Sequence, residues 1–283
     1  MPPLNNFKMN ETQGSIGVFD SGYGGLTILR ELQRRLQDYD WLYLGDNARA
    51  PYGNRSFEIV YEFTRQAVMT LFERGCHLVI LACNTASAKA LRTIQQQDLP
   101  KIAPERRVLG VIRPTVEALG DISRNGHIGI LATPGTVRSR SYSLETAKLY
   151  PGMIVTETEA PMWAPLVENG EAHNPGADYF VKKYVDALLE ADPQTDTIVL
   201  GCTHYPILLP KIRQYTPPHI RIIGQGDLVA ESLADYLRRH PEIERRCTKG
   251  GKTEYLTTES PDKFNGIASY FMRARVEATQ IVI

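Results

Sequence analysis

The chain has no long hydrophobic run and no excess of charge of either sign. Its 283 residues include 32 lysines and arginines and 32 aspartates and glutamates, so the formal net charge is zero. Nucleic-acid-binding surfaces need a basic excess, so we do not expect nucleic acid as the main partner. The longest apolar runs are far too short to span a bilayer, and residues 1–14 lack the apolar region of a signal peptide. These absences favour a soluble cytoplasmic protein without a membrane partner.

Cysteine is scarce, and its spacing excludes several classes of protein. The four cysteines, Cys76, Cys83, Cys202 and Cys247, are too few and too far apart for a disulfide framework in a chain of this size. No two of them show the two-residue spacing that is typical of zinc ribbons and of redox pairs. We therefore expect free thiols and no metal site.

Short apolar runs recur along the chain, with amphipathic stretches between most of them. Strands that alternate with helices indicate a parallel sheet flanked by helices, so the predicted fold class is α/β. The expected strands cover residues 16–19, 41–44, 78–83, 108–112, 128–131, 153–155, 197–202 and 220–223.

The cycle of strand, loop and helix begins again near residue 112. We therefore expect two similar domains, each with a mostly parallel sheet, and an active site in the cleft between them. The length agrees, because 283 residues correspond to about two domains of ordinary size. We place the boundary between the two domains near residue 112.

Two cysteines stand where expected strands end. Cys83 lies in the sequence Ala-Cys-Asn-Thr-Ala-Ser at residues 82–87, and Cys202 lies in Gly-Cys-Thr-His-Tyr-Pro at residues 201–206. Ligands of open α/β sheets bind at the carboxyl ends of the strands, so both thiols are predicted to face one cleft. Each thiol precedes an expected helix start, where the helix dipole is expected to lower its pKa. A single cysteine here could be ordinary packing, but the duplication favours a function.

Two thiols that face each other suit the inversion of a carbon that bears a hydrogen. This reaction needs a base on one face and an acid on the other, with the roles exchanged in the reverse direction. Asp20 ends the first strand and His204 follows Cys202 closely, so each thiol has an ionisable neighbour. A site for an amino acid must also bind its carboxylate with fixed donors and exclude water. Neutral donors at strand ends, which could instead be helix N-caps, are Ser21, Asn84, Thr85, Thr133, Thr136 and Thr203.

A glycine-rich turn at residues 22–25 follows a strand and precedes a helix, as a dinucleotide-binding loop does. The dinucleotide fingerprint needs glycine at its sixth position, which is Thr27 here. We interpret the segment as a tight turn whose backbone N–H groups can bind any anion, and we expect no nucleotide cofactor.

Four motifs, in this order and at these separations, resemble the cofactor-independent bacterial glutamate racemases of the Asp/Glu racemase superfamily. They are Asp-Ser-Gly-Tyr-Gly-Gly-Leu at residues 20–26, Pro-Tyr-Gly at 51–53, and the two cysteine motifs at 82–87 and 201–206. The resemblance extends from about residue 16 to residue 236. Aspartate racemases share the two-thiol plan, but the opening Asp-Ser-Gly and the second cysteine motif resemble the glutamate branch.

The resemblance implies interconversion of L- and D-glutamate without a cofactor, supply of D-glutamate for peptidoglycan, and a homodimer. It implies that Cys83 and Cys202 alternate as acid and base. Asp20 would assist Cys83, while His204 and Glu168 would assist Cys202. The residues that the resemblance places against the substrate are Asp20, Ser21, Tyr52, Gly53, Asn84, Thr85, Thr203 and His204.

The resemblance also implies a discontinuous first domain, formed by residues 1–111 and 228–283. The chain departs from the family pattern at Arg113 and Gly224, where relatives often carry an acid. Three alternatives remain open at this point: an aspartate or broader amino-acid racemase, a catalytically silent amino-acid-binding module, and a thiol redox protein.

Overall fold

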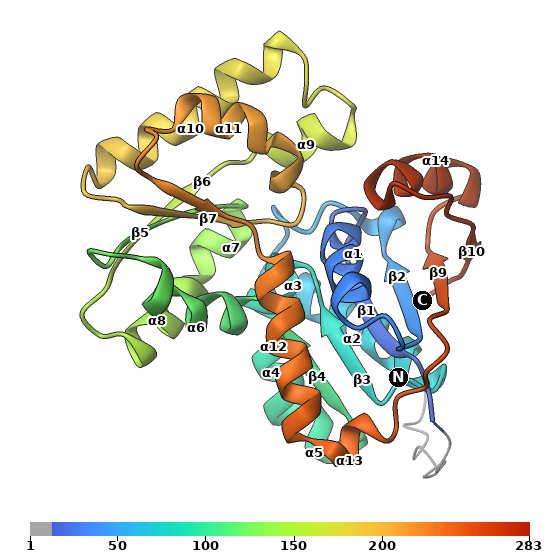
Figure 1. The fold of residues 1–283 in the computed structure, drawn as a ribbon. Helices are drawn as coiled ribbons and strands as arrows, with labels where there is room; N and C mark the ends of the chain where they lie inside the picture. The colour runs from blue at the N-terminus through green and yellow to red at the C-terminus, as the bar shows by residue number, and fades with distance from the viewer. Residues whose placement is uncertain (1–12) are drawn as a thin grey trace.

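Two parallel sheets covered by helices make up the fold (Figure 1). The computed structural model describes residues 13–283, so most of the segment in which no signal peptide was expected lies outside the described residues. Every pair of neighbouring strands in the two sheets runs parallel. The predicted α/β class is therefore confirmed. None of the helices within the described range has the length and apolar character that crossing a membrane requires.

The first sheet contains β1 (Ile16–Asp20), β2 (Trp41–Gly45), β3 (Leu78–Leu81), β4 (Arg107–Gly110), β9 (Thr253–Thr257) and β10 (Ala278–Gln280). In space the six strands follow the order β10-β9-β2-β1-β3-β4. The central strands β1, β2 and β3 are buried along their whole length, as expected for parallel strands covered on both faces.

The helices around the first sheet include the two long amphipathic segments that connect its N-terminal strands. Apolar side chains at helical spacing, such as Leu26, Leu29 and Leu32, are buried against the sheet. The helices are α1 (Gly25–Arg35), η1 (Asn47–Arg49), α2 (Phe57–Glu73), α3 (Asn84–Lys89), α4 (Leu91–Thr93), the π-helix η2 (Ile94–Asp98), α5 (Leu99–Ile102), α12 (Gly226–Arg239), α13 (Pro241–Glu244) and α14 (Pro261–Met272).

The second sheet contains β5 (His127–Ala132), β6 (Ile154–Glu159), β7 (Thr197–Gly201) and β8 (Arg221–Ile223), in the spatial order β6-β5-β7-β8. Its helices are α6 (Ile112–Ile122), α7 (Pro134–Ser139), α8 (Ser141–Leu149), α9 (Trp163–Glu168), α10 (Pro175–Ala191), η3 (Tyr205–Leu208) and α11 (Leu209–Tyr215).

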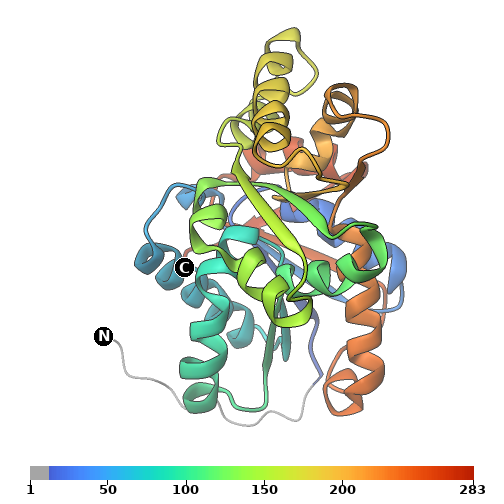
Figure 2. The same ribbon diagram turned by 90° about the vertical axis from the view of Figure 1, so that its left-hand side faces the viewer.

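The chain crosses between the two sheets twice. It leaves the first sheet after β4 and returns through α12, which packs against α1 (Figures 1 and 2). Arg35 of α1 and Glu231 of α12 form an ion pair of 2.7 Å on this contact. β9 then pairs with β2, for example Tyr255 beside Tyr43, so the C-terminal strands complete the first sheet. The division of the chain at residues 111 and 228 stays a prediction.

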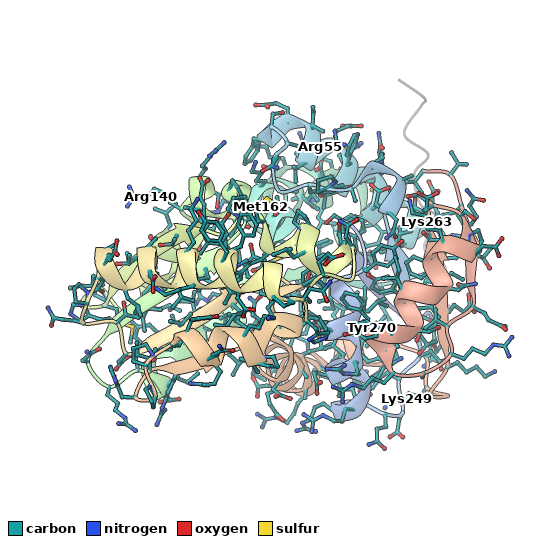
Figure 3. The ribbon with its side chains drawn as sticks, turned by 90° about the horizontal axis from the view of Figure 1, so that it is seen from above. Arg55, Arg140, Met162, Lys249, Lys263 and Tyr270 are labelled. Atoms are coloured by element: carbon teal, nitrogen blue, oxygen red, sulfur yellow. The ribbon has the colours of Figure 1, made fainter. Side chains whose placement is uncertain are left out.

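The C-terminal helix α14 also reaches the second sheet's half of the molecule. The hydroxyl of Tyr270 lies 3.2 Å from Nε2 of His173. In the view from above, Tyr270 and Lys263 lie on α14, while Met162 and Arg140 lie on the other half (Figure 3). The two halves are therefore joined both at the crossings and by α14.

The eight strands expected from the sequence are present, with ends shifted by a few residues, and two strands were missed. β9 reads Thr-Glu-Tyr-Leu-Thr and β10 is only three residues long, so neither contains a continuous apolar run. β6 extends to Glu159, beyond the predicted end at residue 155. The prediction stopped too early because β6 is an edge strand, and its partly exposed residues do not form an apolar run. Edge strands carry less of the apolar pattern on which such predictions depend.

Candidate active site

The two thiols emerge at the carboxyl ends of inner strands of the two sheets. Cys83 follows β3 by two residues and is the N-cap of α3, where its Sγ atom accepts a hydrogen bond from Ala86 N (3.5 Å). Cys202 follows β7 directly. Both line one cavity of about 70 Å³, and both are almost completely buried. The prediction that the two cysteines meet in one cleft therefore agrees with the structure.

Most of the predicted site residues surround this cavity. Asp20 and Thr136 do not line it. Asp20 is buried behind the turn at Gly22, whose N–H donates to Asp20 Oδ2 (3.0 Å), and Thr136 lies behind Thr133. The predicted residues that line the cavity are Ser21, Tyr52, Gly53, Cys83, Asn84, Thr85, Thr133, Glu168, Cys202, Thr203 and His204.

Cys83 has a neutral and an acidic neighbour. Its sulfur lies 3.3 Å from Ser21 Oγ. Burial, together with the nearby Asp20 carboxylate, raises the pKa of Cys83 to about 12, although hydrogen bonds from Ser21 and Ala86 oppose the shift. The expectation that the start of α3 would lower this pKa was wrong, because burial outweighs the helix N-terminus. Cys83 is therefore a protonated thiol near neutral pH.

Asp20 is a buried acid with a perturbed pKa. Burial raises its pKa, and the positive charge of His204 together with backbone hydrogen bonds opposes that shift. One of its oxygens, Oδ1, has no hydrogen-bond partner among the described residues. A buried carboxylate with one free oxygen is costly to keep charged, which is typical of functional sites.

Cys202 belongs to a row of three ionisable groups. His204 Nδ1 lies 3.8 Å from Cys202 Sγ, and His204 Nε2 lies 3.0 Å from Glu168 Oε1. The second contact is an ion pair whose angle does not make a directional hydrogen bond. Burial favours a neutral imidazole, but Cys202 and Glu168 outweigh it and raise the pKa of His204 well above its usual value. Burial also opposes ionisation of Glu168, yet His204 holds the pKa of this carboxyl below its usual range.

The glycine-rich turn at residues 22–25 forms a contact between the two halves of the site. A Cβ atom on Gly24 would lie 2.1 Å from Thr203 Oγ1 and 2.6 Å from His204 Nδ1, so only glycine fits there. Beside it, the Thr27 hydroxyl donates to the Thr203 carbonyl (3.0 Å). The turn therefore places the first sheet directly against the Cys202 motif.

Hydroxyl groups from both halves meet on the other side of the cavity. Thr85 Oγ1 lies 2.9 Å from Thr133 Oγ1, which in turn lies 3.1 Å from Thr136 Oγ1. Thr133 is also the N-cap of α7, since its side chain accepts from Thr136 N. The N-cap interpretation is thus correct for Thr133, and its side chain faces the cavity as well.

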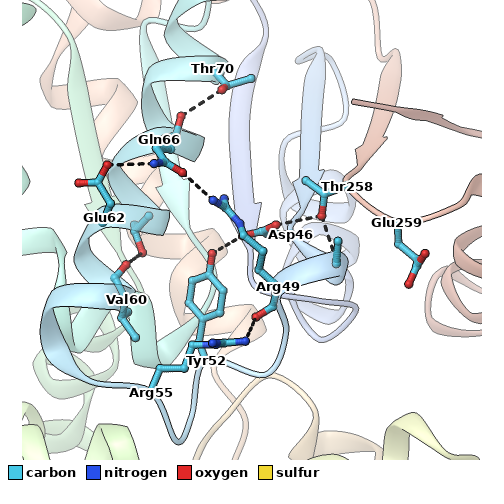
Figure 4. Close-up of polar contacts among 12 residues, drawn as sticks. Asp46, Arg49, Tyr52, Arg55, Val60, Glu62, Gln66, Thr70, Thr258 and Glu259 are labelled. Carbon is cyan, nitrogen blue, oxygen red and sulfur yellow. Dashed lines mark hydrogen bonds and ion pairs between the residues drawn. The ribbon is translucent and has the colours of Figure 1, made fainter. Parts of the chain in front are cut away.

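The loop that carries Tyr52 and Gly53 is held by a residue that the sequence analysis missed (Figure 4). Asp46 is completely buried after β2 and accepts hydrogen bonds from the Tyr52 hydroxyl and from Arg49 Nε (2.6 Å). Its other oxygen accepts from the Thr258 hydroxyl (2.9 Å), in the C-terminal segment. The hydroxyl of Tyr52 is thus engaged by Asp46. The position of Asp46 directly after a strand is the signal that could have identified it.

Asn84 lines the cavity, but its side chain is engaged elsewhere. Its Oδ1 accepts from the Tyr142 hydroxyl (2.7 Å) and its Nδ2 donates to Gln225 Oε1 (2.6 Å). Neither Tyr142 nor Gln225 was singled out from the sequence. As for metal binding, residues 13–283 contain no group of three or more His, Cys, Asp or Glu side chains that could hold an ion.

Comparison with known proteins agrees with this geometry. The family described as Asp/Glu/Hydantoin racemase matches residues 16–233. A glutamate racemase of Ruegeria sp. (strain TM1040) is 42% identical, over 93% of this chain and 98% of the relative.

Solved structures of glutamate racemases have the same fold. Glutamate racemase isoform RacE1 of Bacillus anthracis has a TM-score of 0.87 at 32% identity, over 95% of this chain and 98% of that one. The glutamate racemase of Francisella tularensis in complex with D-glutamate has a TM-score of 0.84 at 29% identity, over 96% and 98%. The chain therefore belongs to the Asp/Glu/hydantoin racemase family. Within that family the named relatives are glutamate racemases, so the resemblance carried by the four motifs is confirmed.

Proposed function

We propose that the protein interconverts L- and D-glutamate by a two-base mechanism that needs no cofactor. Cys83 and Cys202 act on opposite faces of the α-carbon. The observation that carries the proposal is that two thiols from different sheets line one small cavity, each with its own ionisable neighbours. The names and similarity of the relatives support glutamate as the substrate.

The two thiols have different surroundings, and from these we infer which one starts as the base and which as the acid. Cys202, with the positive His204 beside it, takes the α-proton onto its sulfur. Cys83, which burial keeps protonated, gives its own proton to the opposite face of the same carbon. This leaves a thiol at Cys202 and a thiolate at Cys83, which is the starting state for the reverse direction.

Glu168 and Asp20 assist the two thiols from behind. Glu168 keeps His204 positive, so that a thiolate at Cys202 is balanced by charge. Asp20 disfavours the thiolate at Cys83, which keeps Cys83 protonated before the reaction and makes its thiolate the stronger base for the reverse direction. Both acids act through electrostatics on the group that touches the substrate.

The carboxylates of glutamate bind to neutral donors. None of the described residues around the cavity is lysine or arginine. The hydroxyls of Ser21, Thr85, Thr133 and Thr203 supply the donors, together with backbone N–H groups near Gly53 and Asn84. Such fixed donors in a small, mostly buried cavity stabilise the carbanion without a metal or cofactor.

Several finer properties belong to the same proposal. The D-glutamate serves peptidoglycan synthesis and the protein is a homodimer, as the four-motif resemblance implies. The protein works in the cytoplasm, as its composition suggests. We also propose the division into residues 1–111 with 228–283 and residues 112–227. A silent binding module is disfavoured because binding alone has no need of the Cys202–His204–Glu168 row.

The test is to add the purified protein to L- or D-glutamate without pyridoxal phosphate and to follow optical rotation. We expect rotation to decay to zero from either enantiomer. Cys83→Ala and Cys202→Ala should each lose on the order of 10²–10⁴ in rate. Cys76→Ala is the control, because Cys76 is an equally buried thiol outside the cavity. Racemisation of aspartate at a comparable kcat/KM would move the protein to a broader racemase class. Unchanged rotation of both enantiomers would refute the proposal.

A further inference from the structure

A closed ring of hydrogen bonds joins three buried side chains beside Cys83. Asn84 Nδ2 donates to Gln225 Oε1 (2.6 Å), Gln225 Nε2 donates to the Tyr142 hydroxyl (2.8 Å), and this hydroxyl donates to Asn84 Oδ1 (2.7 Å). All three residues are at most 3% exposed. A buried polar network whose members are all satisfied stabilises one specific arrangement.

The direction of the hydrogen bonds in this ring is fixed by the backbone. Gln225 Nε2 also faces the Val111 carbonyl (3.3 Å) and Thr115 Oγ1 (2.9 Å). The hydroxyl of Thr115 donates to the same carbonyl (2.7 Å), so it presents only a lone pair to Gln225. A reversed Gln225 amide would place two acceptors against each other. The amide orientations of Gln225 and Asn84 are therefore determined.

The ring lies where the chain crosses between the two sheets. Val111 is the residue between β4 and α6 at the first crossing, and Gln225 immediately precedes α12 at the second. One side chain thus ties both crossings together. α3, α6 and α12 meet at this point (Figure 1). Tyr142 belongs to α8 of the second domain, and Asn84 follows the catalytic Cys83.

We propose that Gln225 is a positioning residue for racemisation. It holds the turn that carries Cys83 through Asn84, and it holds the domain that carries Cys202 through Val111 and Tyr142. Gln225 does not line the cavity, so it acts on the reaction only through these partners. This inference rests on the proposed function, because a two-base reaction requires both sulfurs to be aligned with one carbon. Misplacement by about 1 Å can cost on the order of 10² in rate.

The first test compares the kinetics of Gln225→Ala, Tyr142→Phe and the double variant. Each single variant should lower kcat about 10- to 100-fold in both directions, with a smaller change in KM. Both changes open the same ring, so the double variant should lose little more than the worse single variant. Tyr142→Phe removes one oxygen atom only and keeps the test decisive if Gln225→Ala does not fold.

The matched control is Tyr61→Phe. The Tyr61 hydroxyl also donates to a side chain, Asp98 Oδ2 (2.9 Å), but it lies on α2 away from the cavity. Its kcat should stay within about twofold of the wild-type value, because this part-buried hydrogen bond lies outside the site. Losses in kcat that multiply in the double variant would overturn the inference, and so would a loss confined to KM.

The second test does not depend on the substrate. Amide hydrogen exchange of the free protein should become faster at residues 84–90 and 111–116 in Gln225→Ala and Tyr142→Phe, and stay unchanged in Tyr61→Phe. Reduced kcat without faster exchange at these segments would overturn the positioning role. If the wild-type protein fails to racemise glutamate, the proposed function fails. The exchange data then decide separately whether the ring holds the two crossings.

Discussion

His204 Nδ1 lies 3.8 Å from the sulfur of Cys202, and no imidazole stands in the corresponding place beside Cys83 among the described residues. The neighbours of Cys83 are the Ser21 hydroxyl and the charge of Asp20. The two thiols are therefore chemically unequal although the reaction they are proposed to catalyse is symmetric. This difference leads to separate predictions for each face of the substrate.

The Glu168→Gln variant should shift the pH dependence of racemisation. Glu168 helps to raise the pKa of His204, so its neutral replacement lowers that pKa. His204 is positive below its pKa, and the activity that needs this charge is lost as the pH rises through it. The alkaline limb of the kcat/KM profile should therefore move to lower pH. The control is Glu171→Gln, which changes an exposed glutamate close in sequence. A profile that coincides with that of the wild type would show that Glu168 does not act on His204.

The Asp20→Asn variant should separate activity from stability. Burial raises the pKa of Asp20 in the folded protein, so ionisation of Asp20 costs stability as the pH rises above its usual pKa, and that cost is fully present above its raised pKa. Removing it should raise the Tm, by about 2–4 °C for each 1 kcal/mol gained. Racemisation should fall, since Asp20 helps to keep the Cys83 proton available to the substrate.

The equilibrium between enantiomers constrains how this loss appears. kcat/KM must fall equally in both directions, so any asymmetry is confined to kcat and KM separately or to isotope effects. Calorimetry and steady-state kinetics on the same preparation check both parts. A lower Tm together with full activity would contradict this prediction and would show that Asp20 only stabilises the turn.

The Asp46→Ala variant should loosen the loop that carries Tyr52 and Gly53. It leaves the Tyr52 hydroxyl and the Arg49 guanidinium without their buried acceptor, which costs roughly 3 kcal/mol. We expect a higher KM together with a lower midpoint of urea unfolding. Asp98→Ala is the matched control, because Asp98 also accepts from a tyrosine and an arginine but away from the cavity. Equal effects of the two variants on KM would contradict a role of Asp46 at the site.

The sequence predicted those parts of the fold in which local pattern and burial coincide. Inner strands such as β3 are apolar on both faces because helices cover both, so they were recognised. β9 and β10 lack a continuous apolar run. β9 pairs with β2, more than 200 residues earlier in the sequence, and β10 joins the sheet only through β9. That pairing has no local signature.

The same distinction holds within the site. Cys83 and Cys202 were predicted to meet because both stand at the ends of parallel strands, and this rule depends only on local sequence. The pKa of Cys83 was predicted in the wrong direction, because a helix N-terminus can be recognised locally and burial cannot. Gln225 was missed because its partner Asn84 lies on a distant segment, and the contact of Asp46 with Thr258 was missed for the same reason.

The most direct test of the two-base mechanism is the fate of the α-hydrogen in D₂O. L-Glutamate is incubated with the enzyme, and both enantiomers are analysed by mass spectrometry early in the reaction. Because one thiol removes the proton and the other delivers a solvent-derived deuteron to the opposite face, the D-glutamate formed should carry deuterium while the remaining L-glutamate keeps its protium. Deuterium appearing at comparable rates in both enantiomers from the start, or D-glutamate that retains protium, would contradict the assignment of Cys83 and Cys202 to opposite faces.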